Sequence, residues 1–289
     1  MRLGQIWRIG GVALALGFLT LFVGGGGRHA IGLVLKPMAE GLAWDRTLLG
    51  AVIAVFMGTT AVTMTVVGRL ADRYPVGWIL AGGFLVSALG VGLMGFVDTA
   101  WQAFLLYGVV FAIGNGAVSI TPVGVMLTRR FGARAGVANS IAISGMGLGQ
   151  LVILAGLSAV LVDVGWRPVF FWLGAINLLA APVLLLAVRE ERRSRTAADS
   201  ARPTDGLEVG AAARRPAFWA LMAAYAICGF QDFFVSSHVV AVALDRGVGP
   251  HFSGNLLALM GVAGLAGVIA AGALADRRGP GWPTAACFA

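Results

Sequence analysis

The sequence predicts an all-α fold of the polytopic membrane class, in which long apolar helices pack side by side across a lipid bilayer. Hydrophobic residues make up 58% of the 289 residues and charged residues 12%, against about 45–50% and about 25% in an average soluble domain. Eight separate apolar stretches reach about 20 residues, the length that spans about 30 Å of hydrocarbon. A water-soluble fold could not hide that much apolar surface, so we expect the lipid bilayer as a partner.

The eight predicted spans follow one another with mostly short connections. They cover residues 11–35, 48–67, 78–97, 101–127, 135–162, 168–188, 218–244 and 252–274, and residues 281–289 would begin a ninth. The basic start and apolar run at 1–22 also suit a cleaved signal peptide, but no small-residue cleavage site follows. We therefore expect a retained first helix. The 43 glycines suit such a bundle, because helices in lipid pack closely through small residues.

The distribution of basic residues predicts the orientation. Sixteen of the 21 Lys and Arg residues fall on the face that the N-terminus would share, and four fall on the opposite face. Cytoplasmic loops carry such an excess, so we expect a multi-pass protein of a cell membrane, of the bacterial inner-membrane kind, with a cytoplasmic N-terminus. The net charge of +8 does not indicate a nucleic-acid partner, because the basic residues lie in loops between apolar runs.

A polar stretch separates the sixth predicted span from the seventh. Residues 189–216 are rich in Arg, Ala and acidic residues and lack apolar periodicity, which is typical of a flexible linker. We therefore divide the chain into a six-helix half at 1–188, a cytoplasmic linker at 189–216 and a second transmembrane half at 217–289. This layout is typical of transporters built from two related halves.

A loop motif occurs twice, at equivalent places in the two halves. Gly68-Arg69-Leu70-Ala71-Asp72-Arg73 follows the second span, and Gly272-Ala273-Leu274-Ala275-Asp276-Arg277 follows the eighth. Five of the six positions agree, at an offset of 204 residues. An Asp at such a turn can pair with a cation or a helix N-terminus of the other half, so we expect gating loops here. The functional residues would be Gly68, Asp72, Arg73, Gly272, Asp276 and Arg277, the alternative being plain turns with cytoplasmic Arg residues.

This pair of motifs resembles the loop signature of the major facilitator superfamily. The resemblance implies twelve helices, of which this chain would hold eight and the start of a ninth, and secondary active transport by alternating access rather than an enzyme. The segments 32–38, 165–167 and 215–219 (GLVLKPM, GWR and RPAFW) are similar to the monocarboxylate-transporter and oxalate/formate-antiporter branch. That branch implies a small organic anion such as a monocarboxylate, carried with protons or by exchange. We expect a monomer.

Ionisable side chains inside the membrane are candidates for function, because their insertion costs about 2.5–3.5 kcal/mol at a helix centre. Arg28 lies in the first predicted span and Asp232 in the seventh, at the same offset of 204 residues that relates the two loop motifs. The repeat would therefore place them at equivalent heights across a central cavity. We expect Arg28 to attract the substrate carboxylate, and Asp232 to release Arg28 or to carry a coupled proton. Alternatively, Arg28 snorkels to the interface and Asp232 caps a helix break.

Four more residues are substrate-binding candidates. His29 stands where the monocarboxylate branch tends to have a basic residue, so the resemblance implies a role beside Arg28. Asn115 and Ser119 are four residues apart in the fourth span, although amides in such helices more often bond neighbouring helices. Ser236 belongs to a polar face of the seventh span, with members Tyr225, Cys228, Gly229, Asp232 and Ser236.

Other functions stay open at this level. An intramembrane hydrolase could use Asp232, or Ser236 with His238, but an aspartyl protease needs two facing aspartates and a serine hydrolase needs Ser and His on facing elements. The tail after Pro280 lacks a basic anchor and a finished helix, so we expect a C-terminally truncated chain, in one version a non-transporting remnant or sensor. The two cysteines form no metal-ligand spacing, and we expect neither a metal nor a cofactor.

Overall fold

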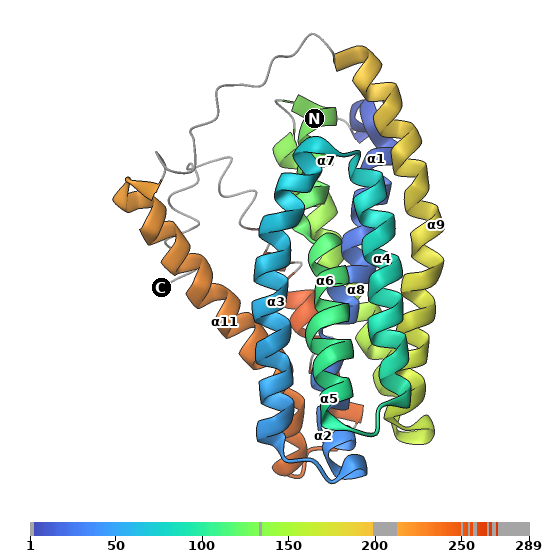
Figure 1. Cartoon of the computed structure of the whole chain (residues 1–289), viewed down its shortest axis with the longest axis vertical. Helices are drawn as coiled ribbons and strands as arrows, with labels where there is room; N and C mark the ends of the chain where they lie inside the picture. Colours follow the sequence, from blue (N-terminus) through green and yellow to red (C-terminus); the bar gives the residue numbers. More distant parts are fainter. Residues whose placement is uncertain are drawn as a thin grey trace.

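The computed structural model describes residues 3–132, 135–198 and 213–249, together with 251–253, 255–256, 259–264, 266–267 and 270. Within these residues every regular element is a helix, and most of the helices run side by side along the long axis of the molecule (Figure 1). Six helices or helix series in this part of the chain are long and apolar enough to cross a membrane. The predicted fold class, a polytopic α-helical bundle, is confirmed.

The first span is broken beyond its middle. α1 (Leu3–Arg28) ends where α2 (Ala30–Leu42) begins, and His29 between them belongs to neither helix. A one-residue break leaves the apolar pattern unchanged, which is why the sequence predicted a continuous helix. α3 (Arg46–Arg73) forms the second span, and the carboxylate of Asp45 accepts the amide of Thr47 at 3.4 Å, as an N-cap does.

The fourth span is also irregular. The third span consists of α4 (Val76–Leu93) and the 3-10 turn η1 (Met94–Phe96). The fourth consists of α5 (Ala100–Ala103), the π-helix η2 (Phe104–Phe111), α6 (Ala112–Ala117) and α7 (Ile120–Phe131). Between α6 and α7, Val118 and Ser119 leave the helix. Pro122 in the first turn of α7 fits this break, because the amides of a first turn have no intrahelical acceptor.

The fifth and sixth spans are α8 (Ala135–Val164) and α9 (Trp166–Ala198). α9 continues past Val188 into the stretch predicted as a linker. Arg and Glu are good helix formers even without an apolar stripe. Lack of apolar periodicity therefore did not mean lack of helix here. Residues 199–212 lie outside the described part.

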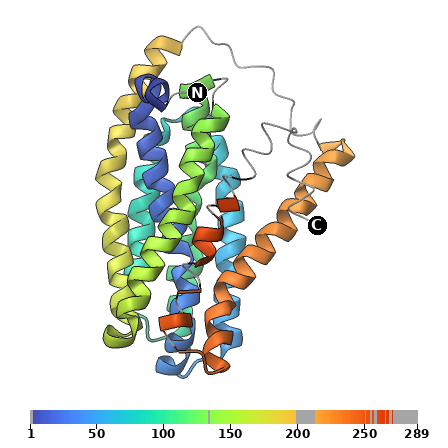
Figure 2. The ribbon, with the colours of Figure 1, turned by 180° about the vertical axis from the view of Figure 1, so that it is seen from behind.

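α11 (Pro216–Asp245) corresponds to the predicted seventh span. Its C-terminal part packs on α2, where Val240 and Ala241 are buried. Toward its N-terminus it diverges from α3, as the front and back views agree (Figures 1 and 2). The described residues of the predicted eighth span at 252–274 are all helical, but ten of its 23 residues, including 271–274, lie outside the described part.

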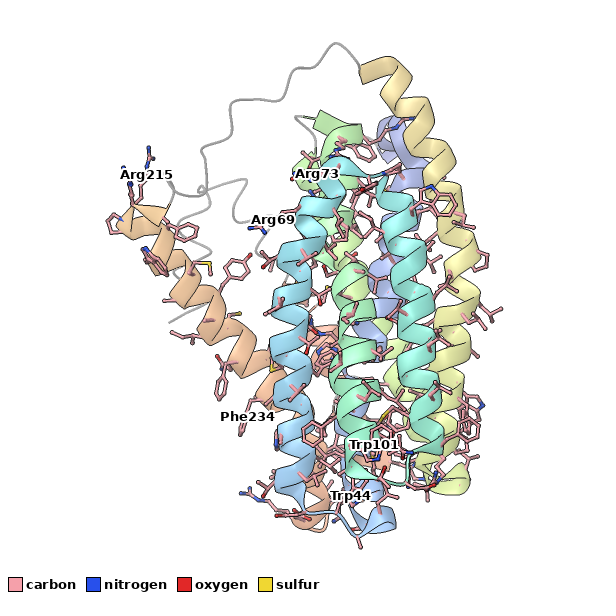
Figure 3. All side chains as sticks on the ribbon, in the orientation of Figure 1. Trp44, Arg69, Arg73, Trp101, Arg215 and Phe234 are labelled. Atoms are coloured by element: carbon pink, nitrogen blue, oxygen red, sulfur yellow. The ribbon has the colours of Figure 1, made fainter. Side chains whose placement is uncertain are left out.

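The two ends of the bundle carry different side chains. Arg69, Arg73 and Arg215 lie toward one end, whereas Trp44 and Trp101 lie at the opposite end (Figure 3). We call these the Arg73 end and the Trp44 end. Cytoplasmic loops of membrane proteins carry an excess of Lys and Arg. The Arg73 end is therefore the one that the sequence predicted to face the cytoplasm.

The helices approach closely where their side chains are smallest. α1 packs along α8, and α4 packs along α9. A Cβ atom on Gly149 of α8 would overlap the carbonyl oxygen of Phe22, and a Cβ on Gly26 of α1 would lie 2.6 Å from the carbonyl oxygen of Gly149. Only glycine allows backbones to come this near. The contact holds the end of α1, and with it Arg28, inside the bundle.

Replacing Gly149 by Ala should destabilise the protein, because overpacking of this kind costs about 1–3 kcal/mol. Gly156→Ala in the same helix is the matched control, since a Cβ there meets nothing within 4 Å and alanine favours a helix over glycine by about 1 kcal/mol. Thermal unfolding in detergent should show a lower midpoint for Gly149→Ala alone. Equal midpoints for the two variants would contradict the packing described here.

Candidate functional site

A charged pair joins α1 to α11. Nη2 of Arg28, the last residue of α1, donates to Oδ2 of Asp232 at 3.0 Å. The two side chains are 28% and 49% exposed, so neither is fully buried. The structure thus brings together the two residues that the internal repeat placed at equivalent positions, while their roles in transport stay predictions.

His29 completes the cluster. Its side chain is 4% exposed, and its Nε2 lies 3.9 Å from Oδ2 of Asp232. Nε of Arg28 points at the same Nε2 at 3.4 Å, and Nδ1 of His29 lies 2.9 Å from the carbonyl oxygen of Gly25. A neutral imidazole with its proton on Nδ1 satisfies both contacts, because Nδ1 then donates to Gly25 and Nε2 accepts from Arg28. His29 therefore helps to hold the guanidinium.

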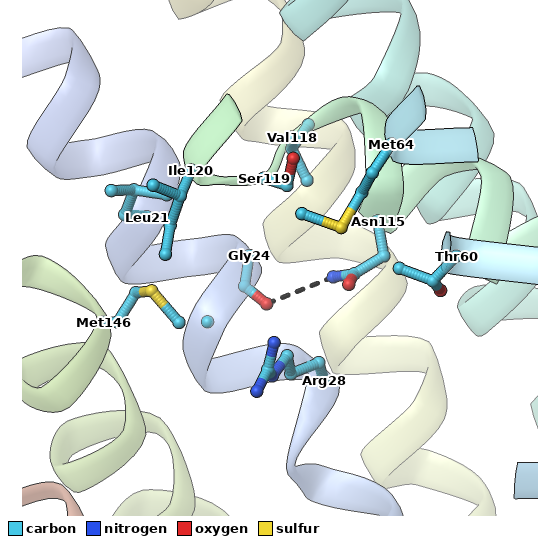
Figure 4. A pocket seen from close by; sticks show the side chains of 11 residues that line it. Leu21, Gly24, Arg28, Thr60, Met64, Asn115, Val118, Ser119, Ile120 and Met146 are labelled. Atoms are coloured by element: carbon cyan, nitrogen blue, oxygen red, sulfur yellow. Dashed lines mark hydrogen bonds between the residues drawn. The ribbon is translucent and has the colours of Figure 1, made fainter. Parts of the chain in front are cut away.

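A small cavity of about 50 Å³ lies beside Arg28, with room for a few water molecules. Four spans contribute to its wall, through Leu21, Gly24, Gly25, Arg28, Thr60, Met64, Asn115, Val118, Ser119, Ile120 and Met146. Figure 4 shows Asn115 between Gly24 and Thr60. Nδ2 of Asn115 donates to the carbonyl oxygen of Gly24 at 3.3 Å, so this amide bonds a neighbouring helix, as amides in membrane helices commonly do.

Two hydroxyls of the wall are buried without a hydrogen-bond partner among the described residues. They belong to Ser119, which the sequence predicted, and to Thr60 of α3, which it did not. A buried hydroxyl without a partner costs about 1–3 kcal/mol, so each would gain from a polar ligand or a water molecule. Thr60 was missed because it is one of four threonines along this part of α3, Thr59, Thr60, Thr63 and Thr65, none of which is ionisable. No periodicity in α3 marks the face that meets Arg28.

A second ion pair joins the same helices near the Trp44 end. Nζ of Lys36 in α2 donates to Oδ1 of Asp245, the last residue of α11, at 3.0 Å. The first predicted span ended at residue 35, which would leave Lys36 in an external loop, but α2 continues through Pro37 to Leu42 and carries Lys36 with it. A cavity of about 450 Å³ adjoins the pair, between α2, α8 and α11. The pair adds a second contact between the first span and α11, beside that of Arg28 with Asp232.

The predicted gating residues are only partly described. Asp72 lies 3.8 Å from Nη2 of Arg129 in α7, an exposed contact within the first half, and pairs of this kind contribute about 0–1 kcal/mol. Gly68 and Arg73 lie in the last turns of α3 near the Arg73 end. The other three predicted positions, Gly272, Asp276 and Arg277, lie outside the described residues, so the expected contact between halves is untested.

The remaining candidates lie in α11. Ser236 is in the helix, but its side chain lies outside the described part. Nδ1 of His238 lies 3.1 Å from the carbonyl oxygen of Phe234, one turn back on the same helix. That contact orients the ring along α11, and the expected hydrolase arrangement of Ser236 with His238 is untested because the serine side chain lies outside the described part.

The Arg28–Asp232 pair should be measurable without any substrate. In a double-mutant cycle of thermal unfolding, Arg28→Gln and Asp232→Asn should be non-additive by about 0.5–1.5 kcal/mol, because each variant breaks the same hydrogen-bonded pair. Arg28→Gln combined with Asp245→Asn is the control, since Asp245 pairs with Lys36 and its effect should add. An additive Arg28–Asp232 cycle would show that the two side chains do not interact.

Comparison with known proteins gives one family. The model of the Major Facilitator Superfamily matches residues 17–289. Monocarboxylate transporter 11 of Mus musculus is 26% identical over 279 residues, which cover 96% of this chain and 60% of that protein. The uncharacterized MFS-type transporter YcxA of Bacillus subtilis is 23% identical over 263 residues, covering 87% of this chain and 62% of that protein. The chain thus spans about 60% of the length of these relatives.

A solved structure agrees in fold. The crystal structure of a bacterial homolog of the human lysosomal transporter Spinster, in an inward-facing and unoccupied conformation, matches with a TM-score of 0.71 and 19% identity. The match covers 93% of this chain and 63% of that one. With a family model that covers nearly the whole sequence and a bundle of the same architecture, the chain belongs to the Major Facilitator Superfamily.

Proposed function

We propose that the protein works as a secondary active transporter with alternating access, and that Arg28 binds the carboxylate of a small organic anion. The observation that carries the proposal is the position of Arg28. It ends a broken membrane helix, lies beside a cavity, and already holds a carboxylate, that of Asp232, at 3.0 Å. A guanidinium recognises carboxylates through charge-assisted hydrogen bonds. The names of relatives such as monocarboxylate transporter 11 support the same substrate class.

In this proposal Asp232 is the internal substitute for the substrate. Its carboxylate occupies the place on Arg28 that a substrate carboxylate would take, and the pair is partly exposed, so it can exchange partners without burying an unpaired charge. A proton on Asp232 would neutralise it and release Arg28 for the anion. Protonation of Asp232 would thereby be coupled to binding of the anion, because the anion can bind Arg28 only after Asp232 has released it.

The two ends of the bundle differ in how α11 lies against the first half. Lys36–Asp245 and the packing of α11 on α2 hold the halves together at the Trp44 end. At the Arg73 end α11 diverges from α3 (Figure 2). We propose that the Arg73 end is cytoplasmic and bears the N-terminus, in a bacterial inner membrane, and that the loop with Gly68, Asp72 and Arg73 takes part in closing it. The proposal includes the division of the chain into a six-helix half at 1–188, a cytoplasmic linker at 189–216 and a second transmembrane half at 217–289.

The first test is uptake of labelled small carboxylates by proteoliposomes under an imposed pH gradient. Arg28→Ala should lower uptake at least about tenfold, since loss of a charged hydrogen bond costs about 1.5–3 kcal/mol. Arg246→Ala is the matched control, because Arg246 is an exposed arginine after the end of α11, and it should retain uptake. Unimpaired uptake by Arg28→Ala would rule out Arg28 as the anion site.

The coupling role of Asp232 predicts a separation of two activities. Asp232→Asn removes the group that takes up the proton, so accumulation driven by the pH gradient should be lost. Exchange of labelled for unlabelled anion at equal pH should persist, because Arg28 is then free of its carboxylate partner. Gradient-driven accumulation by Asp232→Asn would show that the coupled proton binds elsewhere.

A further inference from the structure

The fourth span holds the first by two hydrogen bonds just before the break. The hydroxyl of Tyr107 donates to the backbone carbonyl oxygen of Arg28 at 3.3 Å. Nδ2 of Asn115 donates to the carbonyl oxygen of Gly24, also at 3.3 Å. The two carbonyls are four residues apart on α1, so side chains of one neighbouring span bond successive turns of the helix that ends at Arg28.

The backbone changes its hydrogen-bond pattern at this point. The amide of Gly32 donates to the carbonyl oxygen of His29 at 3.2 Å, three residues back. In a continuous α-helix that amide would reach back four residues, to Arg28. A carbonyl in a membrane span needs a donor from within the protein, and the Tyr107 hydroxyl supplies one to Arg28 where the helix is interrupted.

Tyr107 is itself firmly held. Its side chain is 1% exposed, and its ring centroid lies 5.0 Å from that of Phe56 and 5.1 Å from that of Phe111. It stands on the π-helix η2, a rare form of helix that often occurs at functional sites. Its aromatic neighbours are phenylalanines, so packing alone does not call for a hydroxyl here. A buried phenol needs an acceptor, and the acceptor is the backbone of Arg28.

We propose that Tyr107 is a positioning residue for Arg28. By fixing the carbonyl of Arg28 at the end of α1, its hydroxyl sets the direction in which the guanidinium meets Asp232 and the transported anion. Tyr107 does not line the cavity beside Arg28, and its hydroxyl bonds the backbone of Arg28, so in this proposal it acts on the anion through Arg28. The proposal adds a residue to the anion site and rests on the proposed function only where transport is concerned.

The decisive experiment needs no substrate. Tyr107→Phe removes one oxygen atom and keeps the ring. The unfolding cycle of Arg28→Gln and Asp232→Asn is repeated in the Tyr107→Phe background, where the coupling should fall by at least half. Phe111→Leu is the control, because it loosens the same aromatic cluster without touching the hydroxyl. It should lower the unfolding midpoint and leave the coupling intact. Undiminished coupling in the Tyr107→Phe background would overturn the proposal.

Transport kinetics supply the second readout. Tyr107→Phe should raise the anion concentration for half-maximal uptake about three- to tenfold, the range expected for one lost hydrogen bond. In an Arg28→Gln background, which keeps the backbone carbonyl but removes the guanidinium, it should cause no further increase in the residual uptake, because the effect passes through the guanidinium. A further increase of the same size there would show that Tyr107 acts independently of Arg28, which contradicts positioning.

The two proposals can fail separately. If Tyr107→Phe removes the Arg28–Asp232 coupling but the unaltered protein takes up no carboxylate, the proposed function fails and the positioning role stands. If the protein transports carboxylates and the coupling is unchanged in the Tyr107→Phe background, the positioning role fails and the proposed function stands.

Discussion

The contact of the glycine segment at 24–27 with the fourth and fifth spans is the constraint on which the site depends. A Cβ on Gly25 would lie 2.9 Å from Met146, and one on Gly26 would lie 2.6 Å from the backbone of Gly149. In lipid no hydrophobic force pulls helices together, so close packing and hydrogen bonds decide where a helix lies. Here the backbone itself is the packing surface. Arg28 follows directly, and its place is set by contacts that its own side chain does not make.

Pairing of charge is the second requirement, and it follows from the first. Once the glycine segment holds Arg28 inside the bundle, the guanidinium needs a partner, because an unpaired ion in a membrane span is costly. Asp232 supplies the charge from α11, and His29 accepts a further hydrogen bond. A fully buried pair would cost about 3–5 kcal/mol to break. This pair is partly exposed, which suits exchange between an internal carboxylate and an external one.

The same helices are tied again where α2 and α11 converge. The Arg28–Asp232 and Lys36–Asp245 pairs both run from the first span to α11, so the first span contacts α11 on each side of its break. A hinge between α1 and α2 would let the two pairs respond differently to a movement of α11. Tyr107 bonds the carbonyl of Arg28 directly before the break at His29, between the two ion pairs.

By itself the sequence determined the membrane fold, the first six of its eight predicted spans, the family and the matched positions of Arg28 and Asp232. These features can be predicted from the sequence because the bilayer thickness sets the length of an apolar span, and because an internal repeat places corresponding residues at equivalent positions in the two halves. It did not reveal Thr60, Tyr107 or the Lys36–Asp245 pair, which come together from separate helices of ordinary composition. The π-helix and the break at His29 also left no mark in the apolar pattern. Only the tertiary structure decided which helix faces meet. Each helix forms its backbone hydrogen bonds internally, so its sequence does not reveal which neighbouring helices supply the partners of its side chains.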